Sequence, residues 1–219
     1  MDQVYGARTL LASRELKAIS AFSMSDLPRL ENLNRLAVET VRRDIPGDFV
    51  ECGVYNGGSA AAVACGIRDT ARRVWLYDSF AGMPDIGELD GPSAQDFVGK
   101  CVGDEAKVHS AMRLARFPTE SYEIRKGWFQ DTFTATPLPK AVSILHIDAD
   151  WYDSVMLTLD TFYDLVPDDG LIVLDDFGWW EGCREAFYDF AAKRNIKPLL
   201  ERFGPTQAYW VKGCTNNRV

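Results

Sequence analysis

Residues 142–177 read VSILHIDADWYDSVMLTLDTFYDLVPDDGLIVLDDF. Two apolar runs each lead into a group of acids, and one helix-length segment lies between them. This order predicts a β-α-β unit, whose two strands are parallel and adjacent. Adjacent strands lie ~4.8 Å apart. Asp148, Asp175 and Asp176 should therefore converge at the carboxyl edge of a sheet, where open α/β folds bind ligands.

Carboxylates crowded at one point repel each other unless a cation lies between them. A ligand set made only of oxygen suits Mg²⁺ or a similar hard cation. The alternative is that these aspartates cap helices and line turns. Their position directly after apolar strands favours a functional site.

Working outward, the same alternation of strands and helices continues in both directions. Further strands are expected at 49–54, 73–78 and 122–125, and helices at 14–22, 26–44, 59–68, 104–117, 154–166 and 184–194. Residues 199–203 and 208–212 flank a Gly-Pro turn and predict a terminal antiparallel hairpin. The result is an α/β fold with a mostly parallel sheet and an antiparallel edge.

Two segments stand outside this alternation. Residues 1–24 are expected to form a separate helical segment that acts as a lid or a dimer contact, and residues 25–219 to form the main domain. Residues 81–104 are rich in Gly, Asp and Pro without a clear period. Such a long loop in a compact domain is usually functional, and a substrate lid is expected.

The composition limits the classes of partner. The chain has 219 residues and a formal net charge of −8, which argues against a nucleic-acid partner. It contains no apolar run long enough for a membrane span and no apolar N-terminal stretch typical of a signal peptide. The five cysteines form no Cys-x-x-Cys pair, which indicates free thiols and a cytoplasmic protein.

A glycine-containing turn follows the first expected strand and opens a helix. It reads ECGVYNGGS from Glu51 to Ser59. It is neither the Gly-x-Gly-x-x-Gly of dinucleotide enzymes nor a phosphate-binding loop. Its glycines permit a close approach of a ligand to the backbone, and its acid suits a cationic group such as an ammonium or a sulfonium. The alternative is a plain strand-to-helix turn.

Two further groups could complete a nucleotide site. Asp78 ends the second expected strand, where nucleotide-binding α/β enzymes accept ribose hydroxyls. Trp128 and Phe129 follow the third strand after Gly127, and their rings could flank an adenine or a cationic group. The alternatives are a loop aspartate and core aromatic residues.

The two histidines allow different interpretations. His146 lies inside an apolar strand, which favours a buried histidine with satisfied hydrogen bonds. His109 lies on the helix after the loop, where it could be exposed or act as a catalytic base.

Six motifs in order resemble the macrocin O-methyltransferase family, which methylates sugar hydroxyls in macrolide and aminocoumarin antibiotics. They are RLENL at 29–33, ECGV at 51–54, DSFAGMP at 78–84, GWF at 127–129, HIDAD at 146–150 and DDFG at 175–178. The resemblance runs from about residue 25 to Lys212. It implies a Rossmann-like class I methyltransferase fold with a mostly parallel seven-stranded sheet and a C-terminal antiparallel hairpin.

The resemblance also implies the cofactors and the site. It gives S-adenosylmethionine as the methyl donor, Mg²⁺ as the metal, and a small-molecule glycoside as the acceptor. Asp148, Asp175 and Asp176 would bind the metal, and Asp150 would be the general base, with His109 as the other candidate. A homodimer is a further expectation. The expected cofactor-binding residues are Glu51, Gly53, Tyr55, Gly58, Ser59, Asp78, Ser79, Gly127, Trp128, Phe129 and Asp148.

Two other functions fit the same motifs. A catechol-type acceptor would use the same metal with two vicinal hydroxyls, in a flatter and more apolar pocket. A non-catalytic protein that binds the cofactor and acts through a partner would have no use for the metal or for Asp150. Four aromatic residues near the acids could stack on an acceptor or pack under the loop: Trp151, Tyr152, Trp179 and Trp180.

Overall fold

The computed structural model describes residues 14–135 and 137–214. Its centre is a seven-stranded sheet with the strand order β3-β2-β1-β4-β5-β7-β6. Five strands are parallel, and β7 runs antiparallel to both of its neighbours. The strands are β1 (Asp48–Cys52), β2 (Val74–Asp78), β3 (Tyr122–Lys126), β4 (Val142–Ile147), β5 (Leu171–Leu174), β6 (Glu201–Phe203) and β7 (Gln207–Val211).

The predicted β-α-β unit is confirmed. Strands β4 and β5 are parallel neighbours, and Ile147 pairs with Leu174, so the residues that follow both strands emerge at the same edge. The terminal hairpin is also confirmed, and its second strand is the one that joins the parallel sheet. The reason is burial: four of the five residues of β7 are buried, while β6 carries the exposed Glu201 and Arg202 and forms the edge.

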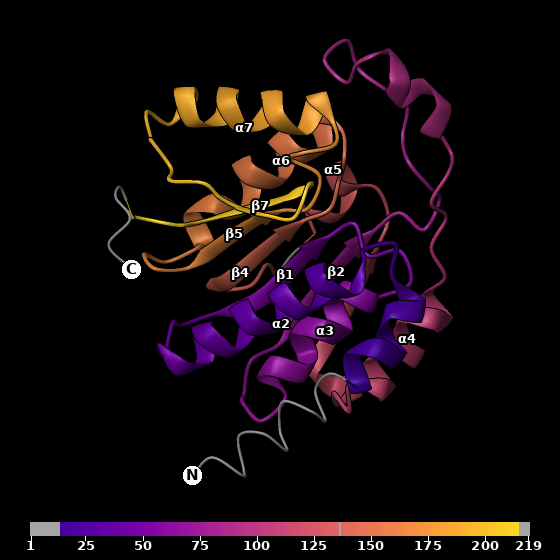
Figure 1. The fold of residues 1–219 in the computed structure, drawn as a ribbon, viewed down its shortest axis with the longest axis vertical. Helices are drawn as coiled ribbons and strands as arrows, with labels where there is room; N and C mark the ends of the chain where they lie inside the picture. Colours follow the sequence, from indigo (N-terminus) through magenta and orange to yellow (C-terminus); the bar gives the residue numbers. More distant parts are fainter. Residues whose placement is uncertain (1–13, 136, 215–219) are drawn as a thin grey trace.

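Helices cover both faces of the sheet (Figure 1). One face carries α2 (Leu27–Arg42), α3 (Gly58–Ile67) and α4 (Glu105–Leu114), and the other α5 (Phe129–Thr132), α6 (Tyr152–Phe162) and α7 (Glu181–Lys193). Successive strand residues face opposite layers. Phe49 packs in the cluster with α2 and α3, and Val50 packs in the cluster with α6 and α7. This period of two produces two apolar cores, one on each side of the sheet.

Some element boundaries differ from those expected. Helix α6 begins at Tyr152 and gives way to a 3-10 turn after Phe162, and α7 begins three residues before Arg184. Neither helix has a side-chain cap at its N-terminus, so the sequence carries no capping signal that would fix the first residue. The four-residue helix α5 was not expected, because one turn is too short to show a period.

The described part of the N-terminal segment packs on the main domain. Residues 14–19 are helical and Ser20–Phe22 form a 3-10 turn, as predicted. Leu16 packs against α2 and α3 through Leu30 and Ala62. Residues 1–13 of the predicted 1–24 segment lie outside the described ranges. A role for this segment in dimerisation stays a prediction.

The loop between β2 and α4 extends away from the sheet beside α5 and α7 (Figure 1). Its base is closed by hydrogen bonds from the Met83 amide to the Lys100 carbonyl (2.8 Å) and from the Gly99 amide to the Met83 carbonyl (2.9 Å). Buried Asp90 accepts a hydrogen bond from the Tyr152 amide (2.7 Å), which anchors the loop to the start of α6.

All five cysteines are free thiols, as predicted. None of the helices in the described ranges combines the length and the apolar character needed to cross a bilayer.

Candidate active site

The carboxyl ends of neighbouring parallel strands are tied together by main-chain hydrogen bonds. The Gly53 amide donates to the Tyr77 carbonyl (2.9 Å), the Asp148 amide to the Cys52 carbonyl (2.9 Å), and the Asp175 amide to the Ile147 carbonyl (3.0 Å). These bonds continue the sheet register by one residue. They place the glycine turn and the acids of β4 and β5 side by side.

A cavity of about 1140 Å³ opens at this edge. It is lined by the glycine turn, by the ends of β2, β4 and β5, and by the loop between β2 and α4. Arg29 is the basic residue among the lining side chains that the structure describes, and the acidic ones are Asp78, Asp85, Asp90, Asp148, Asp150, Asp153, Asp175 and Asp176.

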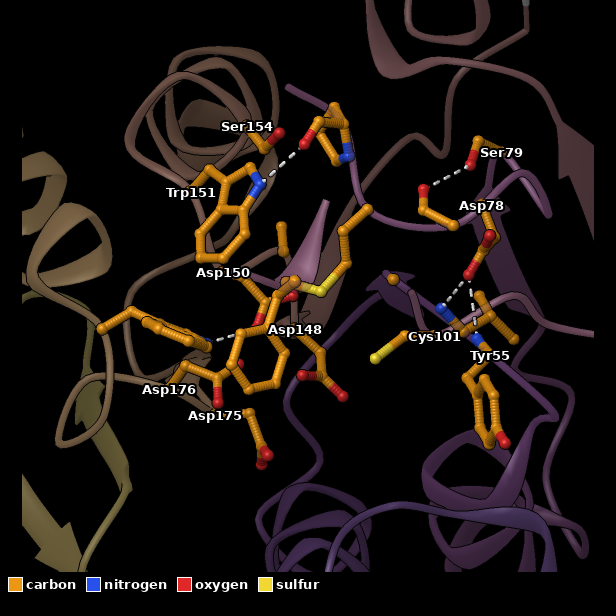
Figure 2. A pocket seen from close by; sticks show the side chains of 18 of the residues that line it. Tyr55, Asp78, Ser79, Cys101, Asp148, Asp150, Trp151, Ser154, Asp175 and Asp176 are labelled. Carbon is orange, nitrogen blue, oxygen red and sulfur yellow. Dashed lines mark hydrogen bonds between the residues drawn. The ribbon is translucent and has the colours of Figure 1, made fainter. Parts of the chain in front are cut away.

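The acids predicted to converge lie together. Asp148, Asp175 and Asp176 each offer a carboxylate oxygen, and these three atoms lie within 4.8 Å of one another. We call these residues the acidic cluster, and Figure 2 shows it on one wall of the cavity. Oδ2 of Asp176 is buried and has no hydrogen-bond partner among the described residues. Such an orphaned buried oxygen needs a further ligand.

The cluster is electrostatically strained. Desolvation and then the charges of Asp175 and Asp176 raise the pKa of Asp148 well above its usual value. Desolvation and then Asp175 raise the pKa of Asp176 to about 6. Like charges at this separation cannot all ionise without compensation. A divalent cation between them would supply that compensation.

Asp175 differs from its two neighbours because it is surrounded by donors. Its Oδ2 accepts hydrogen bonds from Arg29 Nη1 (2.6 Å) and Ser25 Oγ (3.1 Å), and its Oδ1 accepts one from Gln207 Nε2 (2.8 Å). His146 Nε2 lies 3.5 Å from Oδ1. Desolvation by itself would raise the pKa of Asp175, but these contacts lower it to about 2. Asp175 is therefore the permanently charged member of the cluster.

His146 is buried, as expected, and it links two acids. Its Nδ1 lies 2.8 Å from Glu51 Oε1, and its Nε2 faces Asp175. Burial by itself would lower the pKa of His146, but the Asp175 and Glu51 carboxylates raise it to about 9. A protonated imidazole between two carboxylates holds both in place.

Asp150 stands beside the cluster in a constrained conformation. Its backbone is in the left-handed region, with φ of 57°. Its Oδ1 accepts a hydrogen bond from Trp180 Nε1 (2.8 Å), which fixes the direction of the carboxylate. Desolvation and then Asp176 raise the pKa of Asp150 well above its usual value. Raised proton affinity is what a proton-accepting carboxylate requires.

The glycine turn is held by Asp78. One carboxylate oxygen of Asp78 accepts hydrogen bonds from the amides of Val54 (2.6 Å) and Tyr55 (2.8 Å) (Figure 2). The other accepts one from the Phe80 amide (2.6 Å). Gly53 has a φ of 89°, and a Cβ there would lie 1.8 Å from the Asp148 carbonyl oxygen. This position therefore requires glycine.

Aromatic side chains take several different positions. Trp128 is partly exposed and Phe129 stacks on Phe133 with 4.8 Å between ring centroids, and both Trp128 and Phe129 line the cavity. Trp151 is buried and donates to the Pro84 carbonyl (3.1 Å), so it packs under the loop. Tyr152 does not line the cavity, and its hydroxyl donates to Asp189 (2.9 Å).

Three residues expected at the site do not line the cavity. Glu51 is fully buried because it shares with Phe49 the face of β1 that α2 and α3 cover, where it meets His146. Gly58 begins α3 and packs closely against Ser23. His109 lies on α4, and its Nδ1 is 2.6 Å from the Tyr122 hydroxyl. The other expected residues all line the cavity: Gly53, Tyr55, Ser59, Asp78, Ser79, Gly127, Trp128, Phe129, Asp148, Asp150, Asp175 and Asp176.

Sequence reasoning missed the contact of Arg29 with Asp175. A signal existed, because Arg29 lies in the first turn of α2, where the helix dipole disfavours a cation. A cation in that position suggests a nearby anion, and Arg29 has two: the N-cap residue Asp26 (3.3 Å) and Asp175 (2.6 Å).

A family model described as macrocin-O-methyltransferase (TylF) matches residues 12–212 of the chain. The chain belongs to the macrocin O-methyltransferase family. The resemblance found in the motifs is thereby confirmed, and so is the assignment of the chain as an O-methyltransferase.

Curated members of the macrocin O-methyltransferase family are similar over most of the chain. The 8-demethyl-8-(2,3-dimethoxy-α-L-rhamnosyl)-tetracenomycin-C 4'-O-methyltransferase of Streptomyces olivaceus is 31% identical, over 87% of this chain and 75% of the relative. The demethyldecarbamoylnovobiocin O-methyltransferase of Streptomyces niveus is 30% identical, over 95% of this chain and 82% of the relative.

Solved structures agree on the fold. The O-methyltransferase NovP superposes with a TM-score of 0.78 at 28% identity, over 87% of this chain and 81% of that chain. CalS11, a calicheamicin methyltransferase, superposes with a TM-score of 0.67 at 17% identity, over 94% of this chain and 93% of that chain. Its apo structure is described as a TDP-rhamnose 3'-O-methyltransferase. The class I methyltransferase fold predicted for this family member is confirmed.

Proposed function

We propose that this protein transfers a methyl group from S-adenosylmethionine to a sugar hydroxyl of a glycosylated natural product, with Mg²⁺ as the required metal. The observation that carries the proposal is the shared cavity: the acidic cluster and the glycine turn line the same space. Family membership supports the methyl transfer, and the names of the two curated relatives support a glycoside acceptor.

The residues present fit a magnesium ion. The ligands would be Asp148, Asp175 and Asp176, a set made only of oxygen donors, as Mg²⁺ prefers. The orphaned Oδ2 of Asp176 and the raised pKa values of Asp148 and Asp176 are features that a bound divalent cation would relieve. Asp175 is already charged, because its contacts with His146 and Arg29 lower its pKa to about 2.

The residues present also fit the methyl donor. The absence of a side chain at Gly53 lets a ligand approach the backbone beside Asp148. Asp78 holds the glycine turn and lines the cavity, where it could accept ribose hydroxyls. Trp128 could stack on the adenine. The proposed cofactor-binding set is Gly53, Tyr55, Ser59, Asp78, Ser79, Gly127, Trp128, Phe129 and Asp148.

When bound, the donor supplies an electrophilic methyl group and Mg²⁺ lowers the pKa of the acceptor hydroxyl. Asp150 accepts the proton of that hydroxyl at Oδ2, since Oδ1 is occupied by the Trp180 N–H. Held by the proposed cofactor-binding set, the donor would supply the methyl group as its sulfur–carbon bond breaks, and Asp150 would hold the hydroxyl proton. Holding the two reactants in the right orientation in one cavity can lower the activation free energy by ~7–11 kcal/mol.

Calorimetric titration of S-adenosylmethionine into the purified protein with Mg²⁺ tests the donor. Saturable one-site binding is expected. No binding to a folded sample would remove the methyltransferase mechanism for this chain.

The Asp175→Asn variant tests the metal assignment. It should abolish turnover and leave the affinity for S-adenosylmethionine within a few-fold of the unaltered protein. Asp160→Asn is the matched control, because Asp160 lies on α6 outside the cavity, paired with Lys193. Unaltered activity of Asp175→Asn at saturating Mg²⁺ would show that the metal assignment is wrong.

A further inference from the structure

Gln207, the first residue of β7, lies beside Asp175 in the sheet. Leu174 of β5 pairs with Ala208 of β7, and one further step along this antiparallel register brings Asp175 opposite Gln207. The Gln207 side chain is fully buried, and its Nε2 donates to Oδ1 of Asp175 over 2.8 Å. A buried amide also has an acceptor oxygen, which requires a donor from elsewhere in the fold.

Helix α2 supplies that donor. Nδ2 of the buried Asn32 donates to Oε1 of Gln207 over 2.6 Å. Oδ1 of Asn32 accepts in turn from Nη2 (2.8 Å) and Nε (3.3 Å) of Arg35. Residues three apart on a helix share a face, and Arg29, which donates to Asp175, lies one step earlier on the same stripe. One side of α2 therefore carries a hydrogen-bonded chain from the surface residue Arg35 to the acidic cluster.

The chain from Arg35 to Asp175 has a fixed direction. The oxygen and the nitrogen of a side-chain amide have nearly the same shape, so their partners decide which of them points where. A guanidinium donates and does not accept, so Oδ1 of Asn32 faces Arg35 and its Nδ2 faces Gln207. The Gln207 oxygen is then occupied, and its N–H groups are directed at Asp175.

This direction matters for the orientation of the Asp175 carboxylate. Oδ2 is held by Arg29 and Ser25, while the short contact to Oδ1 comes from Gln207 (2.8 Å). The other contact of Oδ1, with His146, is longer at 3.5 Å. Groups that orient a metal-binding carboxylate change the metal affinity by about 10- to 100-fold when they are removed.

We propose that Gln207 is a positioning residue for the magnesium ligand Asp175, and that Arg35 and Asn32 fix the direction in which Gln207 donates. The inference rests on the proposed function, because it concerns the metal site of that function. Among the described residues that line the cavity, none of these three occurs, so they act on the metal through Asp175. The terminal hairpin thereby contributes to a site otherwise built from the ends of β4 and β5.

The Asn32→Asp variant tests the direction of the chain. The new carboxylate keeps the shape of the asparagine and still accepts from Arg35, but it has no N–H for Gln207. The Gln207 amide should turn to donate to it, which points the Gln207 oxygen at Asp175. Calorimetric titration of Mg²⁺ into the metal-free protein should show about tenfold weaker binding. The added negative charge by itself would attract Mg²⁺, so the expected loss is opposite to a simple charge effect.

Asn34→Asp is the matched control. It makes the same substitution two residues further along α2, where Nδ2 of Asn34 donates to the Ala62 carbonyl (2.8 Å) and takes no part in the chain. It also loses a hydrogen bond and gains a charge, so urea unfolding should show a loss of stability. Its Mg²⁺ affinity should remain that of the unaltered protein.

A double-mutant cycle separates positioning from a general loss of structure. Gln207→Met removes the donor to Asp175 and should weaken Mg²⁺ binding by about tenfold. In the Gln207→Met background, Asn32→Asp should cause no further loss of Mg²⁺ affinity, because Asn32 acts through Gln207. Independent structural damage would add instead. Circular dichroism of each variant checks folding, and Gln207→Met decides alone if Asn32→Asp does not fold.

Three results would overturn the proposal: unchanged Mg²⁺ affinity in Gln207→Met, additive losses in the double variant, or equal losses in Asn32→Asp and Asn34→Asp. In each of these cases the unaltered protein still binds Mg²⁺, and the proposed function stands. If the unaltered protein bound no Mg²⁺, the proposed metal site would fall and this inference with it. Titration of S-adenosylmethionine judges the donor separately.

Discussion

Arg29 in the first turn of α2 places its Nη1 atom 2.6 Å from Oδ2 of Asp175 at the end of β5. The Arg29 side chain is 16% exposed and that of Asp175 is 2% exposed. The pair joins residues 146 positions apart in the chain. It ties a helix from the N-terminal half to the acidic cluster and, together with His146, keeps one member of that cluster charged.

Replacing Arg29 by methionine should destabilise the protein. The substitution keeps much of the apolar stem and removes one of the two cationic groups that face the buried Asp175 carboxylate, the other being His146, which costs about 2 kcal/mol. Urea unfolding of the metal-free protein measures the loss. Arg43→Met is the control, because Arg43 pairs with the exposed Asp169 and should change stability by less than about 1 kcal/mol. Equal losses in the two variants would contradict the importance of the Arg29–Asp175 pair.

Magnesium should stabilise the folded protein. Binding between Asp148, Asp175 and Asp176 relieves their repulsion, and at 100 times the dissociation constant it contributes about 2.7 kcal/mol. For a chain of this length, that free energy raises the unfolding midpoint by roughly 5 °C or more. The Asp176→Asn variant should have a higher midpoint than the unaltered protein in EDTA, and a smaller response to Mg²⁺. Differential scanning calorimetry measures the unfolding midpoints in EDTA and in Mg²⁺. An unaltered protein whose midpoint does not rise with Mg²⁺ would contradict the predicted metal site.

Alanine at Gly53 should be poorly tolerated. The new Cβ would collide with the Asp148 carbonyl oxygen and adopt a positive φ, at a combined cost of about 3 kcal/mol. Gly99→Ala isolates the cost of the positive φ from that of the collision. Gly99 also has a positive φ, but nothing lies within 4 Å of its Cβ position. Chemical denaturation and donor titration of both variants are the measurements. A Gly53→Ala protein as stable as Gly99→Ala would show that the turn can move away from Asp148.

Phenylalanine at Trp180 should slow methyl transfer without changing donor affinity. The variant keeps a ring between Phe97 and Trp151 and loses the N–H that fixes Asp150 Oδ1. Loss of one hydrogen bond to a charged group corresponds to about a tenfold lower kcat. Trp151→Phe removes a comparable N–H that bonds only the Pro84 carbonyl, and it serves as the comparison. Equal kcat values for Trp180→Phe and the unaltered protein would exclude a positioning role.

The parallel pairing of β4 with β5 and the place of the acidic cluster were predictable from residues 142–177. Apolar runs ending in acids, with a helix-length spacer, leave few arrangements other than adjacent parallel strands. Convergence of Asp148, Asp175 and Asp176 follows from the register, because Ile147 pairs with Leu174. These features are local or follow from one β-α-β unit, so the sequence pattern contains them.

The partners of those acids were not predictable in the same way. Glu51 was expected at the cofactor, but the alternation of side chains along β1 turns it toward His146. The contacts of Asp175 with Ser25, Arg29 and Gln207 come from three distant segments. No period or spacing encodes which side chain will face which carboxylate.

The sequence by itself determined the α/β class, the parallel unit, the terminal hairpin, the family and the acidic residues of the site, because periodic burial and strand ends are properties of neighbouring residues. Only the tertiary structure decided which carboxylates have cationic or hydrogen-bonding partners and which repel one another without any. It also decided that Met24 and Trp179 remain exposed beside them. Charge compensation and exposure depend on distances between segments far apart in the chain, and those distances exist only once the layers have packed.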